Sequence, residues 1–314
     1  MSGTDPRAEF RLDRAALRLA FDRASGAYES AAVLQARVRA ELLERLELVR
    51  LDPAVVLDLG AGTGLAAREL KRRYRAARVI ALDVAPGMLR EARRHSRPFR
   101  RFARVCADAY RLPLPAASID LIYSNLMLQW CDDLDRALAE IRRVLKPGGF
   151  LALSTFGPDT LRELRAAWLA ADSGLHVSAF LDMHDIGEAL ARAGLAEPVL
   201  DTERFALTYP DARALARDLK SIGAHNVMAA RARGLTGKGK WRAMAQAYEA
   251  LRRDGTLPAT YEVIYGAAWG TPSGARAAHA GSETHIAPGA IRRRVRGTAT
   301  ERAHGCARPA APER

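Results

Sequence analysis

The sequence predicts an α/β fold in which a parallel β-sheet carries helices on both faces. Between residues 53 and 156, short apolar runs alternate with amphipathic stretches, a pattern typical of consecutive strand–helix–strand units. A glycine-rich segment from Gly60 to Gly64 follows the first apolar run and opens the next amphipathic stretch. The composition, 49% hydrophobic and 27% charged, excludes a disordered or collagen-like chain.

The first half of the chain gives the clearest elements. Apolar residues three to four apart predict helices over residues 13–48, interrupted by the helix breakers Ser25 and Gly26. Buried strands are expected over residues 54–60, 77–84, 102–108, 118–125 and 148–156. Helices are expected between them over residues 65–74, 86–95 and 134–145.

Beyond residue 156 the order of elements is looser. Helices are predicted over residues 159–171, 184–193, 211–222 and 241–253, and strands over 197–209 and 260–269. A glycine-rich turn is expected at 234–240. We expect an N-terminal helical segment (1–50), a main domain (51–270) with a helical insert at about 157–255, and a basic, largely disordered tail (271–314).

Several classes of protein are excluded by what the chain lacks. The cysteines Cys106, Cys131 and Cys306 form no C-x-x-C pair, which argues against a disulfide scaffold or a cysteine-based zinc site. No apolar stretch reaches the length of a membrane span, and the N-terminus has no secretory signal. We therefore expect a cytoplasmic protein that does not enter a membrane. We also expect it to be a monomer.

The strongest local signal is the segment Val56-Leu-Asp-Leu-Gly60-Ala-Gly62-Thr-Gly64 at a strand-to-helix junction. Glycines there let a ligand approach the backbone closely. A dinucleotide-binding loop would need a glycine at position 65, which is leucine. Asp58, two residues before the first glycine, would repel a pyrophosphate but suits a ligand that carries an ammonium group.

Two further acidic residues end predicted strands. Asp83 ends the second strand, where its carboxylate can accept hydrogen bonds from ribose hydroxyls, and Asp108 ends the third, where it can meet an adenine edge. Because the carboxyl ends of parallel strands form the ligand site of an open α/β sheet, these features together predict a nucleoside-containing ligand.

These residues and the Leu145-Lys-Pro-Gly-Gly149 turn resemble the class I S-adenosylmethionine-dependent methyltransferases over residues 54–156. The resemblance implies a Rossmann-like sheet and S-adenosylmethionine as methyl donor, with no metal. It implies that Asp83 holds the ribose and that Tyr28 folds over the cofactor as part of an N-terminal lid. The other implied cofactor residues are Asp58, Gly60, Ala61, Gly62, Gly64, Ala107, Asp108 and Asn125.

A closer resemblance lies outside this shared core. Six blocks, over residues 21–35, 123–134, 154–168, 219–226, 234–241 and 260–270, are similar in order to the malonyl-acyl-carrier-protein O-methyltransferases of biotin synthesis. The resemblance covers most of residues 12–296. It implies a malonyl thioester on acyl carrier protein, or malonyl-coenzyme A, as the partner, and the helical insert as a substrate cap.

The implied reaction methylates a free carboxylate. Such a group has an intrinsic pKa near about 4, so it is ionised at neutral pH and needs no general base. The candidate substrate residues lie in the insert: Arg231 and Arg233 as carboxylate clamps, and His225 and Asn226 as hydrogen-bonding groups. Trp130 is expected in the core, as is Phe156, and no nucleophilic role is assigned to Cys131.

Three alternatives keep the same core. A methyltransferase acting on a quinone or other small aromatic would need a base near the acceptor and would favour aromatic contacts, yet only 6% of residues are aromatic. A methyltransferase-like respiratory-complex assembly factor, which hydroxylates arginine on a partner protein, also resembles this family. A nucleic-acid methyltransferase would carry an Asp/Asn-Pro-Pro-Tyr motif where this chain has Ser124-Asn125-Leu126-Met127.

The net charge of +13 suggests the kind of partner. Residues 211–255 carry ten Lys and Arg against four Asp and Glu. A basic rim around the substrate entrance would attract an acidic carrier protein, which is the partner we expect, with no nucleic acid.

Overall fold

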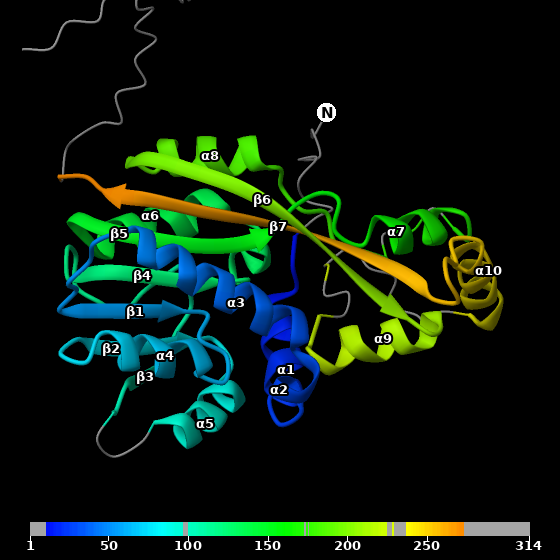
Figure 1. The fold of residues 1–314 in the computed structure, drawn as a ribbon, viewed down its shortest axis with the longest axis horizontal. Coiled ribbons are helices and arrows are strands. Elements are labelled where there is room, and N and C mark those ends of the chain that lie inside the picture. The colour runs from blue at the N-terminus through cyan, green and yellow to red at the C-terminus, as the bar shows by residue number, and fades with distance from the viewer. Residues whose placement is uncertain are drawn as a thin grey trace, which may run out of the picture. The chain divides into compact units, whose positions relative to one another are not determined.

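The computed structural model describes residues 11–96, 100–172, 174, 176–224, 228 and 237–272. Within these residues, seven strands form one sheet in the order β3-β2-β1-β4-β5-β7-β6 (Figure 1). The strands are β1 (Val55–Leu59), β2 (Arg78–Asp83), β3 (Ala103–Cys106), β4 (Ile119–Asn125), β5 (Leu145–Phe156), β6 (Leu195–Tyr209) and β7 (Leu257–Gly270). All the predicted strands are present. The predicted tail lies outside the described residues except for its first two.

The sheet is mixed, which corrects the prediction of a parallel sheet at one edge. Strands β1 to β5 pair in parallel, but β7 runs antiparallel to both β5 and β6. The register of β6 and β7 runs from Leu195 opposite Gly270 to Tyr209 opposite Leu257. Because the end of β6 lies beside the start of β7, the connection between them does not have to cross over the sheet. A second correction concerns residues 146–149. They are predicted as a turn before the strand, but they belong to β5 itself.

Alternating side chains of the central strands fill two hydrophobic layers. Val56 and Leu121 pack with one group of helices, whereas Leu57 and Ile122 pack with the group on the opposite face. The first face is covered by α3 (Val33–Arg45), α4 (Leu65–Arg73) and α5 (Pro86–His95), and the second by α6 (Leu134–Val144) and α8 (Met183–Arg192). This confirms the predicted helices on both faces.

The N-terminal helices lie at the carboxyl ends of the central strands (Figure 1). They are α1 (Arg14–Ala24) and the short α2 (Tyr28–Ala31), and they are separated at Ser25 and Gly26, as the breakers predict. Asp22 accepts a hydrogen bond from the backbone N–H of Gly87 at the start of α5. This contact attaches the N-terminal segment to the main sheet domain.

Three helices lie beyond the edge of the sheet and are called the cap helices. They are α7 (Arg162–Leu169), α9 (Ala212–Ser221) and α10 (Lys238–Glu249), gathered beside the end of β6 and the start of β7 (Figure 1). The predicted bounds of α10 are wrong: its first turn uses residues assigned to a glycine-rich turn, and it ends four residues earlier. It ends early because Asp254 and Gly255, with φ of 47° and 75°, form the tight turn into β7.

No helix among the described residues combines the length and apolar character needed to cross a membrane.

Candidate functional site

The glycine loop between β1 and α4 is built from left-handed backbone. Gly60, Gly62 and Gly64 have φ of 76°, 53° and 80°, a region that side chains rarely adopt. A Cβ on Gly60 would lie 2.3 Å from the Met127 Cγ, and one on Gly64 would lie 2.7 Å from the Ala92 Cβ. A Cβ on Gly62 would meet no atom within 4 Å. Two of the glycines are therefore required by packing, while Gly62 faces open space that a ligand can enter.

Asp83 is fixed by the backbone at the end of β2. One carboxylate oxygen accepts a hydrogen bond from the Gly62 N–H and the other accepts one from the Ala85 N–H, each at 2.8 Å. Burial raises the pKa of Asp83, and these backbone hydrogen bonds oppose that increase. The glycine loop and the strand end thus hold each other in place, with the remaining lone pairs of the carboxylate still able to accept hydrogen bonds.

Asp108, just beyond β3, contacts the N-terminal segment. It accepts a hydrogen bond from the Tyr110 N–H at 2.9 Å and forms an ion pair with Arg14 of α1. The Arg14 guanidinium also lies 4.0 Å from the centre of the Tyr110 ring. Sequence reasoning missed Arg14 and Tyr110, because no motif surrounds either of them.

Helix α2 contacts the other side of the glycine loop. The Tyr28 side chain lines the same cavity as Asp83, and Glu29 lies 2.7 Å from the His95 Nε2 of α5. Burial by itself would raise the pKa of Glu29, but hydrogen bonds with His95 and Thr63 lower it overall. The N-terminal segment therefore contacts both Asp108, beyond β3, and His95, at the end of α5.

Asn125 ends β4 and is held on both sides of its amide group. Its Oδ1 accepts a hydrogen bond from the Ser154 hydroxyl at 2.9 Å, and its Nδ2 donates one to the backbone oxygen of Gln35 at 3.3 Å. Helix α3 is thereby connected to the carboxyl end of the sheet.

Asp58 lies beneath the glycine loop. It is 1% exposed, and burial raises its pKa to about 7. Its Oδ2 has no hydrogen-bond partner among the described residues. Asp58, Ala61 and Gly64 do not line the neighbouring cavity, so they act on it only through the loop that they support.

Two cavities meet at the carboxyl edge of the sheet. The glycine-loop cavity, about 120 Å³, is lined by seven of the predicted cofactor residues: Tyr28, Gly60, Gly62, Asp83, Ala107, Asp108 and Asn125. The cap cavity, about 440 Å³, lies between α3, β6, α9 and the segment that follows β5. Five residues line both cavities: Gln35, Trp130, Phe156, Ile222 and Ala224. We call these five the junction.

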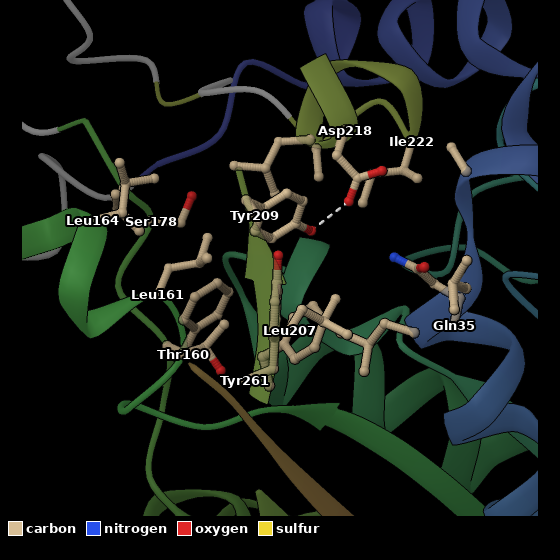
Figure 2. Close-up of a pocket in the computed structure, with 18 of the residues that line it drawn as sticks. Gln35, Thr160, Leu161, Leu164, Ser178, Leu207, Tyr209, Asp218, Ile222 and Tyr261 are labelled. Atoms are coloured by element: carbon tan, nitrogen blue, oxygen red, sulfur yellow. Dashed lines mark hydrogen bonds between the residues drawn. The ribbon is translucent and has the colours of Figure 1, made fainter. Parts of the chain in front are cut away.

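The cap cavity is mainly apolar with one polar wall (Figure 2). On that wall the Tyr209 hydroxyl donates a hydrogen bond to Asp218 at 2.6 Å, and the Tyr261 hydroxyl points toward the same region. Burial raises the pKa of Tyr209 and of Tyr261, so both hydroxyls stay protonated at neutral pH. This wall was not predicted, because β6, α9 and β7 bring together residues far apart in the sequence.

Other sequence predictions have mixed outcomes. The substrate candidates His225, Asn226, Arg231 and Arg233 lie outside the described residues. Phe156 is buried as predicted, yet it also lines both cavities. Trp130 is only half-buried, which corrects its assignment to the core; it packs edge-on against Phe21 with ring centres 5.3 Å apart.

The Cys131 thiol lines the glycine-loop cavity, and burial raises its pKa to about 12. A thiol with so high a pKa stays protonated at neutral pH and is a poor nucleophile, which agrees with the absence of an assigned role.

Comparison with known proteins identifies the family. Residues 57–153 match the methyltransferase domain family. The chain is 55% identical over 266 residues to the malonyl-acyl-carrier-protein O-methyltransferase of Methylovorus sp. (strain MP688), covering 83% of this chain and 90% of that protein. The protein of the same name from Gallionella capsiferriformans (strain ES-2) is 51% identical over 267 residues, covering 83% and 92%.

A solved structure shows the same fold at much lower identity. A putative methyltransferase from Bacillus halodurans C-125 aligns with a TM-score of 0.53 and 17% identity, covering 74% of this chain and 97% of that one. Since more than half of the aligned residues are identical over nine-tenths of the Methylovorus protein, the chain belongs to the malonyl-acyl-carrier-protein O-methyltransferase family, as its sequence blocks predicted.

Proposed function

We propose that this protein transfers a methyl group from S-adenosylmethionine to the free carboxylate of a malonyl thioester on acyl carrier protein. The product would be the malonyl methyl ester that primes pimeloyl and biotin synthesis. The observation that carries the proposal is the junction, because none of the five residues that line both cavities has a titratable side chain. An acceptor such as a phenol would need a base at this position, whereas a carboxylate is already ionised.

The lining of the glycine-loop cavity has groups that suit S-adenosylmethionine. Gly62 leaves open space for a close approach, and the fixed Asp83 carboxylate can accept hydrogen bonds from ribose hydroxyls. Ala107 and Asp108 line the same cavity and are the proposed contacts to the adenine. Asp58 does not line the cavity, and its proposed role is to support the loop from beneath. When bound, the cofactor supplies an electrophilic methyl group on a sulfonium.

The protein's own contribution is to position the carboxylate and exclude water. Trp130, Phe156 and Ile222 give the junction apolar walls, and Asn125 fixes α3 relative to the end of β4. Arg231 and Arg233 remain proposed carboxylate clamps, and His225 and Asn226 remain proposed hydrogen-bonding groups.

The outer face of α9 supports the proposal of an acidic carrier. Arg213, Arg217 and Lys220 are exposed at spacings of four and three residues, so they share one side of the helix. None of them forms an ion pair with another described residue. The opposite side of α9 carries Asp218 and Ile222, which line the cap cavity. A carrier attracted to this basic face would therefore lie next to the cavity that receives its acyl group.

The test is direct methyl transfer. The purified protein is incubated with methyl-labelled S-adenosylmethionine and either malonyl-loaded or acetyl-loaded carrier protein. The malonyl carrier should gain a base-labile methyl group, and the acetyl carrier, which has no free carboxylate, should gain none. Labelling of neither carrier by protein that binds S-adenosylmethionine would refute the proposal.

A further inference from the structure

The junction has two side chains that can donate a hydrogen bond. Among its five residues, Phe156, Ile222 and Ala224 have no polar side-chain atom. Gln35 carries an amide and Trp130 an indole N–H. In the proposed function, the methylated group lies at the junction, because the described linings of the two cavities share these residues.

The position of Gln35 is fixed by its backbone and neighbours. It lies in the first turn of α3, between the buried Leu34 and Val38, and its backbone oxygen accepts the hydrogen bond from Asn125. Asn125 is itself held by Ser154 on β5. The backbone of Gln35 is therefore tied to the two strands whose ends border the glycine-loop cavity.

The side chain of Gln35 is left free. Its amide forms no hydrogen bond with any described residue, and it points from α3 into the cap cavity, toward the wall that carries Tyr209 and Tyr261 (Figure 2). The other glutamine near the junction, Gln129, is different: its Nε2 donates to the Leu126 oxygen at 2.6 Å, and its Oε1 accepts from Thr155 at 3.3 Å. Of these two amides, the Gln35 amide is the one with no hydrogen bond to a described residue, and it is also the one that lines both cavities.

A neutral donor suits a carboxylate that has to act as a nucleophile. A guanidinium bound to the attacking oxygen would hold its negative charge and weaken attack, so the proposed arginine clamps can contact only the other oxygen. An amide N–H forms a weaker, directional bond to one oxygen and leaves the other free. It also adds no positive charge beside the sulfonium of a bound cofactor.

We propose that the Gln35 side-chain amide donates a hydrogen bond to the non-attacking oxygen of the substrate carboxylate and orients the other oxygen toward the methyl group. This inference rests on the proposed function and assigns one contact within it. The N-terminal segment then supplies part of the acceptor site as well as the lid over the cofactor.

The decisive variant is Gln35→Glu, which keeps the shape of the side chain and replaces the donor by a negative charge. Near about pH 8, kcat/KM for malonyl carrier should fall at least about 30-fold through like-charge repulsion, while affinity for S-adenosylmethionine stays within about threefold. The charge of the substrate carboxylate beside it should raise the pKa of the introduced carboxyl above the ordinary glutamate value of about 4.3. Lowering the pH toward about 5.5 should then protonate part of it and let it donate again, so part of the activity relative to wild type should recover. A purely structural role of Gln35 would give no such recovery.

Two further variants complete the test. Gln35→Ala removes the donor and should lower kcat/KM about 10- to 100-fold at every pH. Gln246→Glu makes the same charge change on the exposed face of α10, away from both cavities, and should behave like wild type.

The results for wild type and for the Gln35 variants distinguish failure of the Gln35 assignment from failure of the proposed function. If wild type methylates malonyl carrier but Gln35→Ala and Gln35→Glu stay within about twofold of it, the assignment of Gln35 is wrong and the proposed function stands. Loss of activity in Gln35→Glu without recovery at low pH also overturns the assignment. If wild type itself does not methylate malonyl carrier, the proposed function fails first.

Discussion

The glycine-loop cavity and the cap cavity meet at five residues, yet they are built in different ways. One side of the first is formed by the glycine loop, where Gly60 and Gly62 have positive φ, and by strand ends whose acidic side chains are held by backbone N–H groups. The second is formed by side chains from α3, β6, α9, β7 and the segment after β5. A binding site made from local backbone can be recognised in a short motif, whereas a site made from distant side chains cannot.

Removal of the Asp83 carboxylate should have the largest effect on the glycine-loop cavity. Asp83→Ala leaves the Gly62 and Ala85 N–H groups without their acceptor and removes the proposed ribose contact. The two hydrogen bonds proposed between the Asp83 carboxylate and the ribose hydroxyls would contribute about 3 to 6 kcal/mol to binding. The variant should therefore bind S-adenosylmethionine at least about 100-fold more weakly, as measured by calorimetry. The exposed Asp185→Ala on α8 is the control. Unchanged affinity in Asp83→Ala would contradict the cofactor assignment.

The buried Asp58, beneath the glycine loop, should make the stability of the protein depend on pH. The junction has no titratable side chain that could do the same. Its pKa of about 7 in the folded protein lies above that of the unfolded chain, so the folded state binds more protons between about pH 4 and 7. Stability from this group is therefore lost as the pH rises through that window. Asp58→Asn removes the titration.

The measurement for Asp58 is chemical denaturation at two pH values. Between about pH 5 and 8, the free energy of unfolding of Asp58→Asn should gain about 2 to 3 kcal/mol relative to wild type. A difference between the two proteins that stays constant over this range would show that Asp58 does not titrate in it.

Two glycine substitutions separate packing from ligand access. Gly60→Ala would place a Cβ against Met127 and should lower stability by about 1 to 3 kcal/mol. Gly62→Ala meets no protein atom and should lower stability less, but its methyl group enters the space proposed for the cofactor. Thermal melts with and without S-adenosylmethionine should show that Gly62→Ala loses more of the ligand-induced stabilisation. Equal losses in the two variants would mean that Gly62 does not face the ligand.

The smallest expected effect concerns the outer face of α9. Arg217→Glu should raise KM for malonyl carrier about 3- to 10-fold with little change in kcat, and added salt should reduce the difference from wild type. Arg72→Glu on α4, also exposed, is the matched control. If the two variants have the same KM, carrier docking does not use α9.

Much of the fold could be predicted because the signals are local. The range Pro86–His95 was predicted for α5 and is observed, since a proline in the first turn and a regular apolar stripe define it. The direction of β7 could not be predicted, because an alternating strand has the same pattern whether its neighbour is parallel or antiparallel. The start of α10 could not be predicted, because Gly239 in its first turn and Gly237 at its N-cap are typical of a turn.

The sequence by itself determined the family, the glycine loop and the acidic strand ends, because each depends on residues close together in the chain. Only the tertiary structure decided which side chains line the junction. Gln35, Trp130 and Ile222 come from three separate segments, and none of them lies in a motif with a chemical meaning of its own. They lie together because α3 and α9 pack at the carboxyl edge of one sheet, and long-range packing of this kind leaves no periodic signal in the chain.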